Sequence, residues 1–111
     1  FINRIFTEAE RHAAAALPQP HDYFAKRFAA KEAVYKALSA AGVRGLGWQQ
    51  AETLNQQNGA PMLRLTGQCK TALEAMTPDG YKAHISISLS DEPPYALAFV
   101  IIYAAPLKMD N

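Results

Sequence analysis

Residues 24–38, FAKRFAAKEAVYKAL, constrain the fold most, because their pattern predicts one long amphipathic helix. At roughly 100° per residue, the large apolar side chains fall on one arc that we expect to face a core: Phe24, Phe28, Tyr35 and Leu38. Lys31 projects into this arc, where a purely structural helix would carry another hydrophobic residue. Lys31 therefore either extends out of the core edge or serves a site at the helix margin.

Glu32 and Lys36 lie beside the apolar arc, roughly 40° apart around the helix, on a face otherwise formed by Ala25 and Ala29. One interpretation is an ordinary Glu–Lys pair on a solvated helix, which contributes about 0.2–0.5 kcal/mol. The other is a binding face, because a carboxylate and an ammonium group above alanines leave room for a ligand. The helix pattern by itself leaves both interpretations open.

The composition favours one domain spanning residues 1–111, since half of the residues are hydrophobic. A net charge of +1, without a run of Lys or Arg, gives no indication of nucleic-acid binding. Cys69 is the single cysteine, which excludes an internal disulfide and a cysteine-based zinc site and suits a reducing cytoplasm. We expect Cys69 to be a small packed residue instead of a nucleophile.

The chain carries no pattern typical of membrane insertion or export. Its longest apolar run, residues 95–106, is too short to span a bilayer, and the N-terminus does not resemble a signal peptide. We therefore expect a cytoplasmic protein without a membrane partner. The sequence begins at Phe1 instead of Met, so we also expect further residues upstream of Phe1.

The N-terminal part is expected to be helical. Residues 1–17 read as helix, and Thr7, followed by glutamates, indicates a capped helix start within this segment. Prolines then break the helix, and Asp22 is the expected N-cap of the long helix. The long helix is expected to end in a glycine-rich loop, residues 39–47.

The C-terminal part is expected to contain four strands and one further helix. The strands are expected at residues 48–54, 62–66, 83–89 and 95–104, and the helix at 68–76. Residues 83–89 alternate strictly, which places His84 on a polar face with Ser86 and Ser88. The strand at 95–104 is so apolar that we expect it to be buried on both faces or to lie at an interface. The fold prediction is α+β, with helices packed on a small antiparallel sheet.

The run RFAAKEAVYKAL resembles the second signature motif of holo-[acyl-carrier-protein] synthase, the small bacterial type of 4′-phosphopantetheinyl transferase. That motif reads Arg-Phe-Ala-x-Lys-Glu-Ala-x-x-Lys-Ala. Its spacing is matched here by Arg27, Phe28, Ala29, Lys31, Glu32, Ala33, Lys36 and Ala37. The segments FINRIFTEAE, NGAP and HISISLSDEPPYALAFVII resemble other parts of the family in the family's order, so the similarity covers essentially the whole chain.

The resemblance implies an α+β fold of the 4′-phosphopantetheinyl transferase type. It also implies transfer of the 4′-phosphopantetheine arm of coenzyme A to a serine of apo-acyl carrier protein, with release of 3′,5′-ADP. This chemistry needs charge neutralisation on phosphate oxygens, which Mg²⁺ supplies in the family. The resemblance further implies a homotrimer with active sites between neighbouring subunits.

The resemblance assigns Glu32 as the Mg²⁺ ligand. Lys36, one turn on, is expected to neutralise developing charge on the pyrophosphate or to help orient a metal-bound water, and the two are the expected catalytic residues. Arg27 and Lys31 are expected to bind coenzyme A phosphates, Arg27 as a planar bidentate donor. For Arg27 a place on a solvated face remains the alternative.

Two more residues are expected to contact coenzyme A. His84 matches a His-x-Ser-x-Ser strand near its phosphates in the family, and the alternative is an ordinary structural histidine. Pro61 in the Asn-Gly-Ala-Pro turn matches a residue that lines the coenzyme A groove, and the alternative is simple turn chemistry.

Three departures from the family pattern support a second hypothesis. The opening Gly-x-Gly-x-Asp-Ile strand, which supplies another metal carboxylate, is absent from the sequence. Residues 39–42 replace Gly-Thr-Gly, and Ala60 replaces a lysine. The alternative function is therefore a non-catalytic module that binds coenzyme A or acyl carrier protein, and a structural α+β protein without a ligand is a third.

Overall fold

The computed structural model describes residues 1–108, so residues 109–111 of the predicted domain lie outside the described residues. Six helical segments and four strands follow one another along the chain. In order they are α1 (Ile2–Ile5), α2 (Glu8–Ala15), α3 (Pro20–Leu38), the 3₁₀ turns η1 (Ser39–Ala41) and η2 (Trp48–Gln50), β1 (Ala51–Asn55), β2 (Pro61–Leu65), α4 (Gly67–Met76), β3 (Tyr81–Glu92) and β4 (Tyr95–Pro106).

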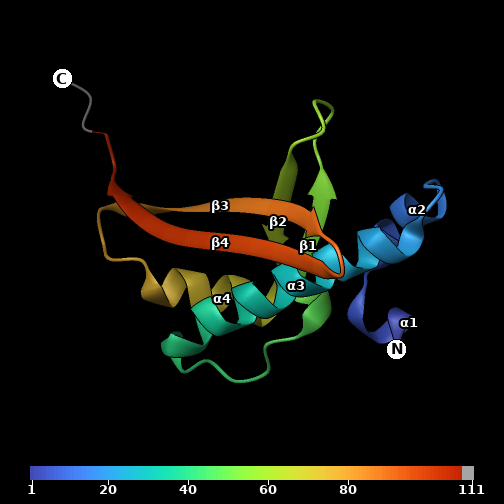
Figure 1. Ribbon diagram of the computed structural model, residues 1–111. Helices are drawn as coiled ribbons and strands as arrows, with labels where there is room; N and C mark the ends of the chain where they lie inside the picture. Colours follow the sequence, from blue (N-terminus) through green and yellow to red (C-terminus); the bar gives the residue numbers. More distant parts are fainter. Residues whose placement is uncertain (109–111) are drawn as a thin grey trace.

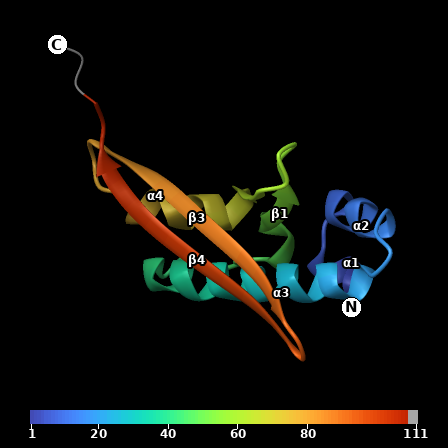
Figure 2. The same ribbon diagram turned by 45° about the horizontal axis from the view of Figure 1, so that its top comes forward.

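The strands form two antiparallel hairpins, which pack against the helices. In the longer one, β3 pairs with β4 along its whole length, from Tyr81 opposite Pro106 to Glu92 opposite Tyr95. This hairpin crosses α3 obliquely, and α1 and α2 lie together near the start of α3 (Figures 1 and 2). The shorter hairpin pairs β1 with β2 and contacts both α3 and β3. The α+β prediction is therefore confirmed.

The apolar core lies where α3, α4 and the two hairpins meet. Val34 and Leu38 of α3 are fully buried there, together with Cys69 and Ala72 of α4. Side chains from the inner face of β4, including Val100, pack against this cluster. The prediction that Cys69 is a small packed residue is consistent with this position.

The structure corrects the predicted start of α3. The helix begins at Pro20, with Gln19 as its N-cap, so the prediction of an N-cap at Asp22 is wrong and Asp22 lies in the first turn. The physical reason is that proline suits the first helical position, where its missing N–H has no intrahelical partner to lose.

The structure also corrects which face of α3 is buried. The buried side chains are Tyr23, Arg27, Ala30, Lys31, Val34 and Leu38. Tyr35 of the predicted apolar arc is 46% exposed, and Phe24 and Phe28 are half-buried. The hydrophobic pattern alone did not predict the buried face of α3 correctly. The face that meets α2 and β1 is the one that carries Arg27 and Lys31.

Most other element predictions are confirmed within a few residues. The capped start at Thr7 is present: Thr7 Oγ1 accepts from the Glu10 N–H at 3.2 Å, and Glu10 Oε1 accepts from the Thr7 N–H at 2.9 Å. The helix predicted over residues 1–17 is interrupted at residues 6–7, so it forms two helices, α1 and α2. The strand predicted from residue 48 begins at Ala51, after η2, and the last two strands are longer than predicted.

One face of β4 is open to solvent. Alternate side chains along it are 42–70% exposed: Tyr95, Leu97, Phe99, Ile101 and Tyr103. Burial on both faces is therefore wrong within the described chain, because only the side chains of the other pleat meet α3 and the core. The alternative, that the strand lies at an interface, stays a prediction. None of the helices within residues 1–108 is both long and apolar enough to cross a membrane.

Candidate active site

The outer side of α3 and the adjoining stretch of β4 enclose an open groove of about 480 Å³, here called the α3–β4 groove. It is lined by Ala25, Phe28, Ala29, Glu32, Ala33 and Lys36 of α3 and by residues 96–98 of β4. Five of these nine side chains are alanines, so the backbones of α3 and β4 are accessible to a ligand. The structure therefore confirms that Glu32 and Lys36 stand above small residues beside open space.

Glu32 and Lys36 are the charged groups of this groove. Glu32 is half-buried and Lys36 is exposed. Among residues 1–108, no ion pair within 4 Å joins their side chains. The simple interpretation of a helix surface pair is thus not realised, and both charges remain available to a ligand.

Aromatic side chains border the groove on the side of η2. Trp48 of η2 lies 5.4 Å from the ring of Phe28 and 5.9 Å from the ring of Tyr35, the latter stacked at 26°. Phe28 lies about one helical turn before Glu32, and Tyr35 lies about one turn after it. The stacked rings therefore pack against the side of α3 from which the Glu32 carboxylate projects.

Arg27 lies on the opposite side of α3 and is only 4% exposed. Its Nη2 donates to Asn55 Oδ1 at 2.6 Å, and its guanidinium carbon lies 4.0 Å from the centre of the Tyr23 ring. Within residues 1–108 its Nε has no hydrogen-bond partner, and no carboxylate lies within 4 Å of its guanidinium. A solvated position for Arg27 is wrong, and its charge lacks a carboxylate partner within the described residues.

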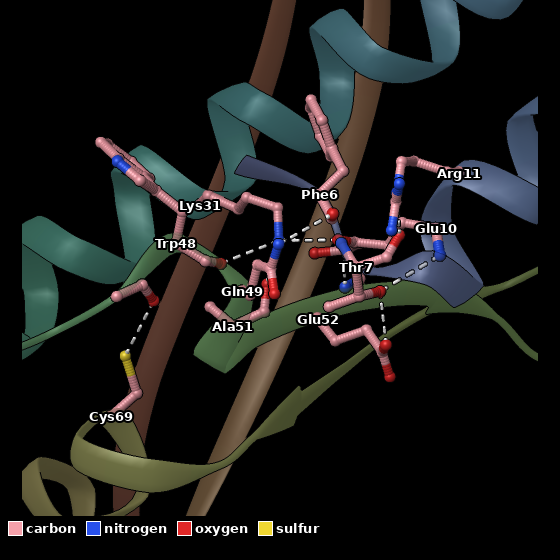
Figure 3. A network of polar contacts seen from close by, with 12 residues as sticks. Phe6, Thr7, Glu10, Arg11, Lys31, Trp48, Gln49, Ala51, Glu52 and Cys69 are labelled. Atoms are coloured by element: carbon pink, nitrogen blue, oxygen red, sulfur yellow. Dashed lines mark hydrogen bonds and ion pairs between the residues drawn. The ribbon is translucent and has the colours of Figure 1, made fainter. Parts of the chain in front are cut away.

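Lys31 is also buried, and its ammonium group is fully engaged (Figure 3). It donates to Glu10 Oε1 at 2.9 Å, to the Trp48 carbonyl at 2.9 Å and to the Ala51 carbonyl at 2.8 Å. These three acceptors match the three N–H donors of an ammonium group. Lys31 therefore neither extends out to solvent nor has a donor free for a phosphate in this arrangement.

Glu10 receives bonds from three directions. Oε1 accepts from the Thr7 N–H and from Lys31, and Oε2 accepts from the Thr53 N–H at 2.8 Å. Neither side chain of the Glu10–Lys31 pair is exposed to solvent. Burial lowers the pKa of Lys31 below its ordinary value, and the hydrogen bond and charge of Glu10 offset part of this change.

Pro61 and His84 lie apart from the groove in the described chain, since neither lines it. Pro61 is the first residue of β2 and pairs with Asn55. His84 is half-buried on β3, and its ring stacks on Tyr103 with centroids 5.1 Å apart at 18°. The sequence-predicted residues thus form three groups: Glu32 with Lys36, Arg27 with Lys31, and the separate Pro61 and His84.

Glu32 is the one carboxylate among the groove residues. Within residues 1–108, no cluster of three or more His, Cys, Asp or Glu side chains is placed to hold a metal. Mg²⁺ is commonly held by one or two carboxylates, with substrate phosphates and water completing its shell. A groove with one carboxylate is compatible with this ion, and Glu32 is the residue of the groove that would hold it.

The sequence reasoning missed the part played by Glu10. The pattern Thr7-x-x-Glu10 indicated a helix cap, and the structure contains that cap. The cap explains only one of the bonds that the carboxylate makes. A better signal was the pair of facts that Lys31 projects toward a core and that a buried lysine needs a carboxylate partner.

Comparison with known proteins agrees with this fold and shows the family. The model of the 4′-phosphopantetheinyl transferase superfamily matches residues 1–100. Curated relatives named holo-[acyl-carrier-protein] synthase include those of Phenylobacterium zucineum, 46% identical over 96% of this chain and 77% of theirs, and Xanthobacter autotrophicus, 45% identical over 96% of this chain and 78% of theirs. The chain belongs to the 4′-phosphopantetheinyl transferase superfamily, a family of enzymes.

Solved structures agree as well. The holo-[acyl-carrier-protein] synthase of Neisseria meningitidis is similar with a TM-score of 0.73 and 32% identity, over 93% of this chain and 79% of that one. An ACPS–CoA complex from Chronobacterium ammoniagenes is similar with a TM-score of 0.75 over 96% of this chain and 81% of that one. At 24% identity, this second likeness concerns the fold alone.

Proposed function

We propose that the protein is a Mg²⁺-dependent holo-[acyl-carrier-protein] synthase. It would transfer 4′-phosphopantetheine from coenzyme A to a serine hydroxyl of apo-acyl carrier protein and release 3′,5′-ADP. The observation that carries the proposal is that Glu32 and Lys36 of the signature helix stand unpaired with each other above an alanine-lined groove. The names of the relatives, which refer to the acyl carrier protein, support it.

The reaction joins the serine oxygen to the phosphorus of phosphopantetheine as the bond between that phosphorus and the bridging oxygen breaks. The 3′,5′-ADP leaves with the bonding electrons, and the serine proton is lost. Lys36 attracts the pyrophosphate and neutralises charge that develops on it. Glu32 would hold Mg²⁺, which would supply further neutralisation of that charge. The alanines permit the close approach that positions the reacting groups.

The proposed contacts to coenzyme A differ from one another in the structural observations that support them. For Arg27, the support is a guanidinium without a carboxylate partner in residues 1–108, to which a phosphate would supply the opposite charge. For Lys31, the geometry favours an internal role, because its three donors already have partners. Pro61 and His84 remain proposed contacts, and both would have to reach coenzyme A outside the α3–β4 groove of their own chain.

A homotrimer with active sites between subunits would bring such distant residues to a neighbour's groove. The support within this chain is the exposed apolar row on β4, from Tyr95 to Tyr103, beside which His84 lies. Large exposed apolar patches are typical of protein interfaces. Sedimentation of the wild type and of Phe99→Ser tests this, because replacing a central side chain of the row should favour the monomer. We propose a cytoplasmic location, which suits a chain with one unpaired cysteine.

The direct test is to mix the protein with coenzyme A, Mg²⁺ and apo-acyl carrier protein and to follow the holo form by gel shift and mass spectrometry. Formation of the holo form that depends on protein and Mg²⁺ supports the proposal. Calorimetric binding of coenzyme A or carrier protein without any transfer would instead favour the non-catalytic binding module. Comparing coenzyme A with dephospho-coenzyme A in wild type and Arg27→Ala asks whether Arg27 recognises the 3′-phosphate.

A further inference from the structure

The Glu10–Lys31 pair joins four elements at one point. Glu10 comes from α2 and Lys31 from α3, while the carbonyl groups of Trp48 and Ala51 come from η2 and the start of β1. Thr53 of β1 adds a bond to the second oxygen of Glu10. Figure 3 shows Glu10, Lys31, Trp48 and Ala51 converging next to α3. The pair therefore holds the inner side of α3 against three other elements, α2, η2 and β1.

The pair also holds the rotation of α3 about its own axis. Lys31 and Glu32 are consecutive, so their side chains leave the helix about 100° apart. With the Lys31 ammonium held by three directional bonds, α3 cannot turn or slide without breaking at least one of them. The direction of Glu32, and of Lys36 one turn later, follows from this constraint.

On the groove side, packing constrains α3 less: apart from the stack of Trp48 on Phe28 and Tyr35, the described lining is mostly alanine. Small side chains make up most of the groove lining: Ala25, Ala29 and Ala33 on the helix and Ala96 and Ala98 on the strand. Small side chains interlock weakly, and an open groove by its nature leaves them without neighbours. Buried ion pairs contribute less to net stability than to the choice of one specific arrangement in some proteins. Here the arrangement that needs fixing is the one that aims Glu32.

We propose that Glu10 is a positioning residue for the transfer reaction. It holds Lys31, and through Lys31 it sets the rotation of α3 that turns Glu32 and Lys36 toward the α3–β4 groove. This inference rests on the proposed function, and it assigns to Glu10 and Lys31 a role that requires no contact with substrate.

The test uses the double variant Glu10→Gln/Lys31→Met, which removes both charges together, so neither is left buried and unpaired. The matched control is Lys26→Met/Asp91→Asn. It removes the 2.8 Å ion pair between Lys26 of α3 and Asp91 of β3, which is solvent-accessible. For both variants, urea unfolding gives the folded fraction, and hydrogen exchange reports the backbone amides of residues 28–36. Mn²⁺ binding in the presence of coenzyme A, followed by electron paramagnetic resonance, reports the carboxylate site without turnover.

In the folded double variant we expect faster exchange in residues 28–36, weaker Mn²⁺ binding and a turnover per folded molecule lower by about 100-fold, the effect of a displaced catalytic group. High Mg²⁺ should restore part of the activity, because Glu32 is still present. The control should keep wild-type values. A purely structural role predicts instead that activity falls only in proportion to the unfolded fraction, with Mn²⁺ affinity unchanged, and this result would overturn the proposal.

If the double variant does not fold, Glu10→Asp decides the question, because it keeps the charge and withdraws the carboxylate by one methylene group. The folded Glu10→Asp protein should show the same losses to a smaller extent, and wild-type Mn²⁺ affinity and turnover would contradict the inference. The two hypotheses fail differently. An inactive wild type removes the proposed function, whereas an active wild type with an equally active double variant removes only the positioning role.

Discussion

Both sides of α3 carry charged side chains, but those on the inner side are buried and those on the outer side face open space. On the inner side, Lys31 is buried, and every donor of its ammonium group is bound within the chain. On the outer side, Glu32 and Lys36 face an open groove and are not paired with each other in the described chain. The fold thus uses the charge of Lys31, whereas the outer charges are left for a ligand; Arg27, also buried, has no carboxylate partner within residues 1–108.

This difference shows why charge type and spacing do not by themselves identify site residues. Lys31 and Lys36 both belong to the signature motif, yet only Lys36 can offer its donors to a phosphate without breaking an internal bond. A signature motif therefore combines residues that act on substrate with residues that hold the helix in place. Substitutions on the two sides should separate stability from activity.

The largest effect on stability is expected from Lys31→Met. This substitution leaves Glu10 charged and buried without its partner and removes the donor to two carbonyl groups. Breaking a buried ion pair in this way typically costs about 3–5 kcal/mol, which urea unfolding would measure. Lys36→Met on the outer side is the control and should change the free energy of unfolding by less than about 0.5 kcal/mol. Equal losses for both would mean that the two sides do not differ as described.

The largest effect on activity alone is expected from Glu32→Gln. The variant keeps the shape of the side chain but loses the negative charge, so turnover should fall by about 100- to 1,000-fold, as when a group that stabilises transition-state charge is removed. Because the side chain is on the outer side, the free energy of unfolding should change by less than about 0.5 kcal/mol. Turnover over a Mg²⁺ titration tests this, and near-normal Mg²⁺-dependent rates would exclude Glu32 as the metal ligand.

A smaller effect is expected from filling the groove. Ala29→Leu adds a branched side chain beside Glu32, and it should lower kcat/KM for coenzyme A by up to about 100-fold by displacing the substrate. Stability should be nearly unchanged, because the new side chain enters open space instead of the core. Ala40→Leu, at an exposed position of η1, is the matched control. A similar loss in the control, or none in Ala29→Leu, would argue that substrate does not lie in the α3–β4 groove.

The sequence predicted well those elements whose pattern depends on neighbouring residues. The strict alternation around His84 predicted β3, and the Thr7–Glu10 cap is a local hydrogen-bond motif. The rotation of α3 was predicted wrongly, because it depends on which elements cover each face. Tyr35 is more hydrophobic than Arg27, yet Tyr35 is exposed, while Arg27 is buried against Tyr23 and Asn55.

The candidate site was predictable to the same extent. The positions of Glu32 and Lys36 follow from helix geometry, so the sequence placed them on one open face. The partner of Lys31 could not be found in this way, because Glu10 lies 21 residues earlier and is brought near only by the packing of α2 on α3. The sequence also did not indicate that Pro61 and His84 lie outside the groove, since the distance between separate elements has no local signal.

The smallest expected effect concerns the interior next to Lys31. Burial is the main cause that raises the pKa of Cys69, whereas the hydrogen bond to Gly47 and the charge of Lys31 lower it. An acid whose pKa is higher in the folded state loses protons first in the unfolded state, so folding stability falls as the pH rises above the ordinary thiol pKa, about 8.5. In Cys69→Ala this part of the decline should be absent, a difference in slope of at most about 1.4 kcal/mol per pH unit. Tyr23, whose pKa is also raised by burial, titrates in both proteins, so the difference between the two urea-unfolding series reports the thiol together with its charge interaction with Lys31. Identical slopes would mean that the thiol is as well solvated in the folded protein as in the unfolded chain, and the inner side of α3 would then be less closed than the exposures of its side chains indicate.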